Sequence, residues 1–136
     1  MPSLPRPLRK SMQGLMVWFA RRGGNRMVIL TTKGARSGRP HVVVVGRFPD
    51  QEDAFFVVAS NGGSARHPAW YINMAKNPDE VWAEVGRRKF KVRPQLLKGA
   101  ERQAAMARVV AASPGYASYE KKTDREIPVV RLVPVG

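Results

Sequence analysis

The chain has 136 residues, of which 43% are hydrophobic and 25% are charged, a composition typical of one soluble globular domain with its own core. There is no cysteine, and no carboxylates cluster beside the two histidines, which excludes disulfides and thiolate catalysis and leads us to expect no metal site. The formal net charge is +14, and such an excess of cations predicts an anionic partner without identifying it.

The N-terminal segment is basic and amphipathic. Apolar residues recur there at helical spacing, at Leu8, Met12, Leu15 and Phe19. Two interpretations stay open: a helix packed on its own domain, or an interfacial helix that touches anionic lipid. No stretch reaches the roughly 20 apolar residues of a membrane span. We therefore expect a cytoplasmic protein, with peripheral contact at the inner face of the cell membrane as the second interpretation.

Three strands are predicted over 26–32, 41–48 and 54–60, because β-branched runs alternate there with short polar or glycine-rich loops. Short connections of this kind favour an antiparallel meander. A hairpin follows, with strands over 80–85 and 88–97 around Gly86-Arg87, and a closing strand is predicted over 127–135.

Two further helices are predicted, one beginning at Pro68 and ending before Asn77-Pro78, the other over 100–112. With the N-terminal helix, this gives three peripheral helices and about six mostly antiparallel strands, an α+β fold. Closing the sheet into a small barrel would remove its exposed edges. We divide the chain into an N-terminal segment over 1–25 and a barrel domain over 26–136.

A basic loop is predicted between the first two strands, in the stretch "TTKGARSGRP". It carries Lys33, Arg36 and Arg39 at three-residue intervals. Its glycines allow the backbone to approach a ligand closely, and Arg36 can hold a phosphate through two parallel hydrogen bonds. Nucleic acid, a lipid headgroup and a phosphorylated cofactor all remain possible partners for such a loop.

A second motif, "ASNGGSARHPAWYIN" at 59–73, runs from the end of a strand into a helix. Backbone amides of residues 60–63 and the helix N-terminus are suited to anionic or carbonyl groups. Trp70 and Tyr71 can wall a planar ring, or Trp70 can pack in the core.

A third motif, "SPGYASYEKKTDREIPVV" at 113–130, places Tyr116 and Tyr119 three residues apart. On a helical turn the two share a face. They can line a pocket and offer phenolic protons, or simply pack.

Together and in this order, "LTTKGARSGRP", "VVASNGGSARHPAWYINMAKNP" and "YASYEKKTDREIPVVRL" resemble the deazaflavin-dependent nitroreductase family, the F420-dependent oxidoreductases of mycobacteria and related actinobacteria. The resemblance extends from about Met27 to the C-terminus. It implies a split β-barrel of the kind that also binds FMN, in agreement with the predicted meander.

The resemblance implies an enzyme that uses coenzyme F420, a deazaflavin with a phosphate and an oligoglutamate tail. Reduced F420 would deliver a hydride to a quinone, enone or nitroaromatic acceptor, and the proton would come from Tyr116, Tyr119, Ser60 or solvent. The implied cofactor-binding residues are Ala35, Arg36, Ser37, His41, Val42, Val43, Val44, Val58, Ala59, Ser60, Asn61, Ala69, Trp70, Tyr71, Asn73 and Tyr116.

Three positions depart from the family pattern. Asn61 stands where several relatives have lysine, Ser113 stands at an aromatic position of the nitroreducing members, and Lys122 replaces another aromatic residue. The last two positions bear on the acceptor rather than on the cofactor.

Two alternatives stay open at this point. One is a split-barrel oxidoreductase that binds FMN. The other is a non-enzymatic basic module for membrane or nucleic acid, although no nucleic-acid motif is present and we expect no nucleic-acid partner. A monomer or a homodimer fits the sequence equally well.

Overall fold

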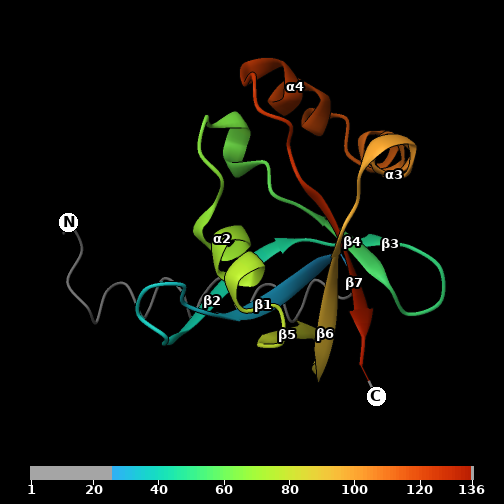
Figure 1. Cartoon of the computed structure of the whole chain (residues 1–136). Coiled ribbons are helices and arrows are strands. Elements are labelled where there is room, and N and C mark those ends of the chain that lie inside the picture. The colour runs from blue at the N-terminus through green and yellow to red at the C-terminus, as the bar shows by residue number, and fades with distance from the viewer. Residues whose placement is uncertain (1–25, 136) are drawn as a thin grey trace.

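The computed structural model describes residues 26–135; the predicted N-terminal helix and the first part of the domain division lie outside them. An antiparallel sheet forms the frame of the described part (Figure 1). Its strands lie in the order β2-β1-β5-β6-β7-β4-β3. In chain order they are β1 (Met27–Lys33), β2 (Pro40–Gly46), β3 (Phe48–Pro49), β4 (Phe55–Val58), β5 (Val81–Val85), β6 (Arg88–Leu96) and β7 (Val129–Pro134).

Every neighbouring pair of strands is antiparallel. The sheet curls so that β2 approaches β4, although the two are far apart in the strand order. The predicted antiparallel, barrel-like α+β fold is therefore confirmed for the described residues. Curling matters for function because it sets β2 opposite the segment that follows β4.

The strand predicted over 41–48 is two strands, which makes seven in place of about six. β2 ends at Gly46, which pairs with Met27, whereas Phe48 of β3 pairs with Phe56 of β4. Between them the backbone N–H of Arg47 donates to the carbonyl of residue 26 over 2.9 Å. The chain thus changes pairing partner at the corner of the barrel, where a glycine eases the bend.

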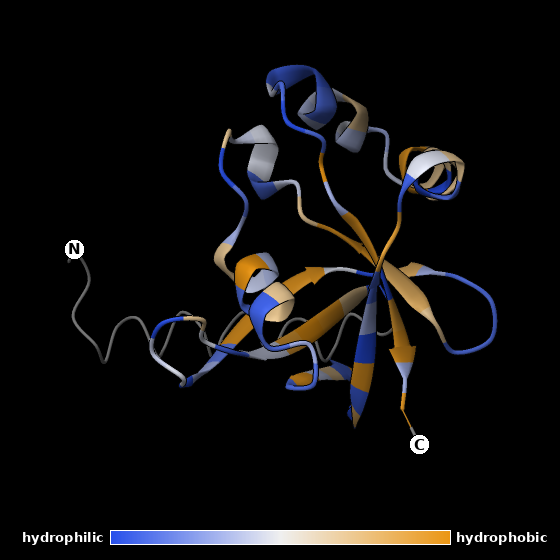
Figure 2. Ribbon diagram, in the orientation of Figure 1, coloured by the Kyte–Doolittle hydropathy of each residue, from blue (hydrophilic) through white to orange (hydrophobic). Residues whose placement is uncertain are grey.

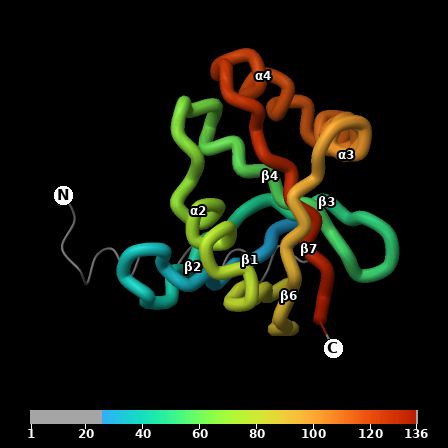
Figure 3. Tube along the Cα trace, in the orientation of Figure 1, coloured from blue at the N-terminus to red at the C-terminus, as the bar shows by residue number. Residues whose placement is uncertain are grey.

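The helices of the described part are α2 (Ala69–Lys76), α3 (Gly99–Ala112) and α4 (Gly115–Lys122), with a 3₁₀ turn η1 (Asn61–Gly63). The helices predicted over 68–76 and 100–112 are confirmed within a residue. α4 was not predicted as a helix. Figure 3 shows α2 beside β1 and β2, and α3 and α4 together at the other end of the molecule. None of these helices, within residues 26–135, has the length and apolar character needed to cross a membrane.

Two apolar clusters form the core, and β4 belongs to both. Phe55 and Val57 pack into the cluster under α2, while Phe56 and Val58 pack into the cluster under α3. All four residues are buried, and Figure 2 shows apolar residues concentrated along the strands of the sheet. β4 is therefore fixed on both faces, which gives the segment after it a rigid start.

Candidate active site

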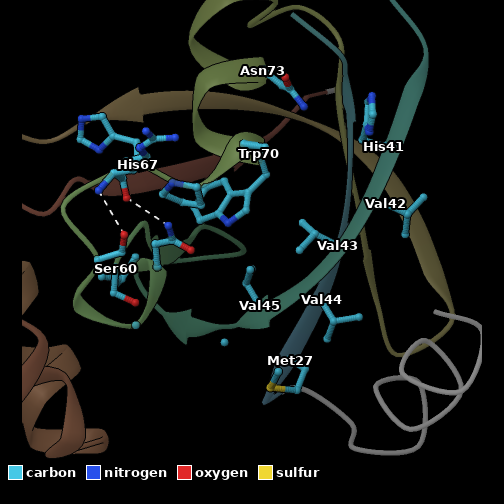
Figure 4. Close-up of a pocket in the computed structure, with 18 of the residues that line it drawn as sticks. Met27, His41, Val42, Val43, Val44, Val45, Ser60, His67, Trp70 and Asn73 are labelled. Atoms are coloured by element: carbon cyan, nitrogen blue, oxygen red, sulfur yellow. Dashed lines mark hydrogen bonds between the residues drawn. The ribbon is translucent and has the colours of Figure 1, made fainter. Parts of the chain in front are cut away.

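A cavity of about 750 Å³ lies between β2 and the segment from the end of β4 to α2 (Figure 4). Its size is typical of small-molecule sites. β2 contributes six consecutive residues to the wall, 41–46, because it is an edge strand of the sheet. Met27 and Tyr116 complete the wall toward the end of β2.

The cavity collects most of the cofactor-binding residues predicted from the sequence. Of that set, the wall contains His41, Val42, Val43, Val44, Val58, Ser60, Asn61, Ala69, Trp70, Asn73 and Tyr116. Ala59 is fully buried in the core between two wall residues. Tyr71 is half-buried behind the wall, with its ring edge-on to Trp70 at a centroid distance of 6.4 Å. Trp70 itself is buried and serves both the core and the wall.

The basic loop joins the cavity through two hydrogen bonds. The backbone N–H of Ala35 donates to Oδ1 of Asn73 over 2.9 Å. Oγ of Ser37 lies 3.1 Å from Nε2 of His41. Asn73 and His41 both line the cavity, while Arg36 is exposed on the loop. The positive charge of the loop therefore stands at one end of the cavity.

Asn73 is a buried bridge between three elements. Its Oδ1 accepts from the loop, and its Nδ2 donates to Oγ1 of Thr32 on β1 over 3.2 Å. Because both the oxygen and the nitrogen of its side-chain amide are hydrogen-bonded, Asn73 fixes α2 against β1 and anchors the basic loop to α2.

The turn after β4 has three successive residues with positive φ: Asn61 at 48°, Gly62 at 65° and Gly63 at 83°. Asparagine tolerates this region better than other side chains with a Cβ. At Gly63 a Cβ would also lie 2.9 Å from Cβ of Lys122. The turn is therefore pressed against α4, and Asn61 closes it by donating from Nδ2 to the carbonyl of Arg66 over 3.1 Å.

Arg125, in the linker between α4 and β7, holds the same wall from outside. Its guanidinium donates to the carbonyl oxygens of Ser64 (2.9 Å), Ala59 (3.1 Å) and Ser60 (2.9 Å). Its Nη1 lies 3.1 Å from Nδ1 of His67. The sequence reasoning quoted this arginine within a motif but gave it no role, because its partners lie about sixty residues away.

Tyr116 closes the end of the cavity near Gly46. A Cβ added at Gly46 would lie 3.3 Å from the Tyr116 hydroxyl. Its ring is edge-on to Phe48 (5.4 Å) and Tyr119 (5.2 Å). Burial, and then Tyr119, raises the pKa of Tyr116, so its hydroxyl stays protonated at neutral pH. Of the three predicted proton donors, Tyr116 and Ser60 line the cavity, and Tyr119 packs behind Tyr116.

Several wall residues were missed by the sequence reasoning. They are Met27, Val45, Gly46, Gly62, Ser64, Arg66, His67 and Pro68. Val45 and Gly46 continue the run of wall residues predicted at Val42, Val43 and Val44, because β2 is an edge strand and presents consecutive residues to the cavity. His67 belonged to a quoted motif, and its position before a helix was the available signal.

The fold and the site together define a split β-barrel protein with a cofactor-sized cavity along its edge strand. Within that class, the model of the F420H(2)-dependent quinone reductase family matches residues 10–134. The chain belongs to this family, which confirms the resemblance to F420-dependent oxidoreductases seen in the sequence.

Individual relatives agree with this assignment. The chain is 33% identical over 113 residues to the F420H(2)-dependent quinone reductase Rv1261c of Mycobacterium tuberculosis (strain ATCC 25618 / H37Rv), covering 81% of this chain and 74% of the relative. A solved structure of an F420-H2 dependent reductase, FDR-A, is 37% identical with a TM-score of 0.70, covering 79% of this chain and 93% of that one. A second solved structure, described only as a domain-swapped dimer, is 32% identical with a TM-score of 0.72, covering 92% of this chain and 96% of that one.

Proposed function

We propose that this protein transfers a hydride from reduced F420 to a quinone, with both molecules held in the cavity along β2. By its family the chain is an F420-dependent reductase, and F420 is its cofactor. The names of the relatives specify a quinone as the acceptor, and quinone reduction is the part of the activity that we carry over from them as a proposal.

The residues present fit this cofactor. F420 is planar and largely apolar at the deazaflavin ring and polyanionic at the phosphate and tail. The cavity is correspondingly apolar along Val43 and Trp70, and it ends at a loop rich in cations. The observation that carries the proposal is the pair of hydrogen bonds that joins this loop to cavity residues, Ala35 to Asn73 and Ser37 to His41.

We assign the phosphate to Ala35, Arg36 and Ser37, with His41 beside them. Arg36 supplies a planar pair of donors, and the Ser37 hydroxyl and loop amides supply further hydrogen bonds. The oligoglutamate tail would lie among the remaining exposed cations of the loop, Lys33 and Arg39.

When bound, the reduced deazaflavin supplies the hydride. The protein's own part is to orient the two reactants and exclude water. Valines of β2 and Val58 provide an apolar wall for the ring. We assign Tyr116 as the donor of the proton that the reduced acceptor needs, because its phenol lines the cavity and is protonated at neutral pH. Ser60 is the second donor in reach.

The acceptor range extends beyond quinones in this proposal to enones and nitroaromatics. Ser113 and Lys122 stand at two positions of the family pattern that bear on the acceptor. Lys122 packs beside Gly63 and lies over the Tyr119 ring at 5.9 Å. Since neither is aromatic here, we expect quinones to be better acceptors than nitroaromatics.

Titration of the protein with F420 and, separately, with FMN tests the cofactor, with quenching of its three tryptophans as the signal. We expect tight binding of F420 and weak binding of FMN. Arg36→Ala should weaken F420 binding about tenfold or more, because charge-assisted hydrogen bonds to the phosphate are lost.

Arg87→Ala is the matched control, since Arg87 is also an exposed arginine in a hairpin turn but lies between β5 and β6. Equal weakening of F420 binding by both substitutions would indicate a general effect of net charge and would contradict a phosphate site at Arg36. Preference for FMN would move the protein to the flavin-binding branch of the fold, and binding of neither would leave the basic-module alternative.

We place this activity in the cytoplasm, where F420 would be reduced by other enzymes. A lipid-dissolved quinone would give the basic N-terminal segment over 1–25 a reason to contact the inner face of the membrane, and that segment lies outside the described residues. The domain-swapped dimer among the similar structures supports a homodimer as one form of the protein.

A further inference from the structure

His67 lines the cavity immediately before α2 but has no role in the assignment above. Figure 4 shows it on the same side as Ser60, across from the strand that carries Val43 and Val45. Its ring packs against Tyr71 with centroids 4.9 Å apart. A histidine fixed at the wall of a candidate redox site can act on a bound ligand, and its protonation state decides how.

The contact with Arg125 determines which ring nitrogen of His67 carries the proton. A guanidinium has only donors, so Nδ1, 3.1 Å from Nη1 of Arg125, must be the acceptor. The proton of the neutral ring is therefore on Nε2. Arg125 cannot easily turn away, because its other donors are bonded to the carbonyls of Ala59, Ser60 and Ser64.

The charges around His67 favour the neutral ring. Burial, and then the positive charge of Arg125, lowers the pKa of His67. The other ionisable groups next to it are the phenol of Tyr71 on α2 and the neighbouring Arg66, and neither carries a negative charge at neutral pH. An imidazolium would also lose the Nδ1 acceptor that Arg125 uses.

We propose that the Nε2–H of His67 donates a hydrogen bond to a carbonyl oxygen of a ligand bound in the cavity, and that Arg125 is the positioning residue that fixes this tautomer. The inference rests on the proposed function. Deazaflavin rings and quinones both present carbonyl oxygens, so the shared chemistry is a carbonyl acceptor. A donor fixed before the reaction stabilises negative charge that develops on a carbonyl oxygen during hydride transfer.

The tautomer can be measured without any ligand. Nitrogen-15 NMR of the tag-free protein distinguishes the two ring nitrogens, and His41→Gln assigns the spectrum because the chain has only two histidines. We expect His67 to be protonated on Nε2 alone at pH 7 and to titrate below the ordinary histidine pKa. A proton on Nδ1, or a ring that is already charged at pH 7, would overturn the proposal.

Two substitutions test the hydrogen bond itself. His67→Phe keeps a flat ring against Tyr71 but removes both nitrogens, and His67→Gln keeps a donor near the place of Nε2. We expect His67→Phe to weaken either F420 binding or quinone turnover about tenfold, the size of one lost hydrogen bond to a buried acceptor. His67→Gln should restore most of that loss. Thermal unfolding of both variants checks that the fold is intact.

The kinetic or binding constant that changes shows whether the carbonyl belongs to the cofactor or to the acceptor. A weaker Kd for F420 in the absence of quinone assigns the hydrogen bond to the cofactor ring. An unchanged Kd with a higher KM or lower kcat for a soluble quinone such as menadione assigns it to the acceptor. Arg125→Lys keeps the positive charge but loses the fork of donors, so the NMR spectrum should show a mixture of His67 tautomers while the pKa of His67 stays below its ordinary value.

The outcomes separate this inference from the proposed function. If the wild type binds F420 and reduces the quinone, and His67→Phe has wild-type Kd, KM and kcat, only the inference is overturned. A wild type that binds no F420 overturns the proposed function and the inference with it. Loss with phenylalanine that glutamine does not rescue would overturn the hydrogen bond, because glutamine keeps the donor that the proposal requires.

Discussion

At the scale of single residues, Gly34 shows how tightly the basic loop is built. It is buried, and a Cβ placed on it would clash with Oγ of Ser37 and lie 2.7 Å from Nε2 of His41. The absence of a side chain at position 34 therefore lets Ser37 and His41 meet above the loop. These are the two side chains through which we connect the loop to the cofactor phosphate.

Gly34→Ala should therefore weaken F420 binding several-fold while costing little stability. The clashing atoms belong to side chains that can rotate, so the expected response is separation of Ser37 from His41 rather than unfolding. Tryptophan quenching measures the binding, and urea unfolding measures the stability.

Gly115→Ala is the control, because a Cβ there meets nothing within 4 Å and the residue begins a helix. It should leave binding unchanged and stability equal or slightly higher. Unchanged F420 binding in Gly34→Ala would contradict the assignment of Ser37 and His41 to the phosphate.

At the scale of elements, the turn between β3 and β4 is held by one carboxylate. Asp50 accepts from Nε of Arg131 on β7 over 2.7 Å and from Nη1 of Arg108 on α3 over 3.1 Å. Both guanidinium groups also lie over the ring of Phe56, at 5.3 and 5.6 Å. Asp50 thus joins three elements at the end of the molecule away from the basic loop.

The net effect of these surroundings lowers the pKa of Asp50. Burial alone would raise it, and the hydrogen bonds from Arg131, from the backbone of Gln51 and from Arg108, with the charge of Arg131, together outweigh burial. A lowered pKa in the folded state means that Asp50 contributes stability above its unfolded pKa, about 3.9, and that this contribution is lost as the pH falls through the folded value.

Asp50→Asn should lower the free energy of unfolding by about 1–3 kcal/mol at pH 7, the usual size for charged hydrogen bonds. The difference from the wild type should shrink as the pH falls below about 4, from the unfolded pKa of Asp50 toward its lower folded value. Urea unfolding across pH measures both. Glu126→Gln, at an exposed carboxylate, should change stability by less than about 0.5 kcal/mol. A pH-independent difference for Asp50→Asn would show that the ion pairs are not its cause.

At the scale of the whole molecule, charge and shape act together. The formal net charge is +14, and among residues 26–135 the strand order leaves β2 at an edge, beside the cation-rich loop. A ligand with a flat apolar end and a polyanionic end matches both features. The positive field of the molecule should therefore contribute to the affinity for F420 at long range.

Raising the salt concentration from about 50 mM to about 500 mM should weaken F420 binding several-fold, because added ions screen exposed charges within a few ångströms. A deazaflavin that lacks the phosphate and the tail should bind more weakly but change little with salt. Isothermal titration of both ligands compares the two slopes. Equal slopes would mean that the cations of the loop do not meet the phosphate and tail.

The sequence predicted well the elements whose formation depends on residues close together in the chain. The hairpin over 81–85 and 88–96 follows from alternation around a glycine turn, and the helix over 99–112 follows from its periodicity and its stop at Ser113-Pro114. Three short motifs were sufficient for the family, because their residue types and order are specific even though each alone is ambiguous.

By itself, then, the sequence determined the mostly antiparallel strands, the helices with clear boundaries, the F420-dependent family and the basic loop. Only the tertiary structure decided that the run over 41–48 changes partner at Arg47, that Tyr119 lies behind Tyr116, and that Arg125 holds His67 and the cavity wall. The physical reason is distance along the chain. Arg125 and its partners are about sixty residues apart, and contacts of that separation leave no local periodicity in a sequence.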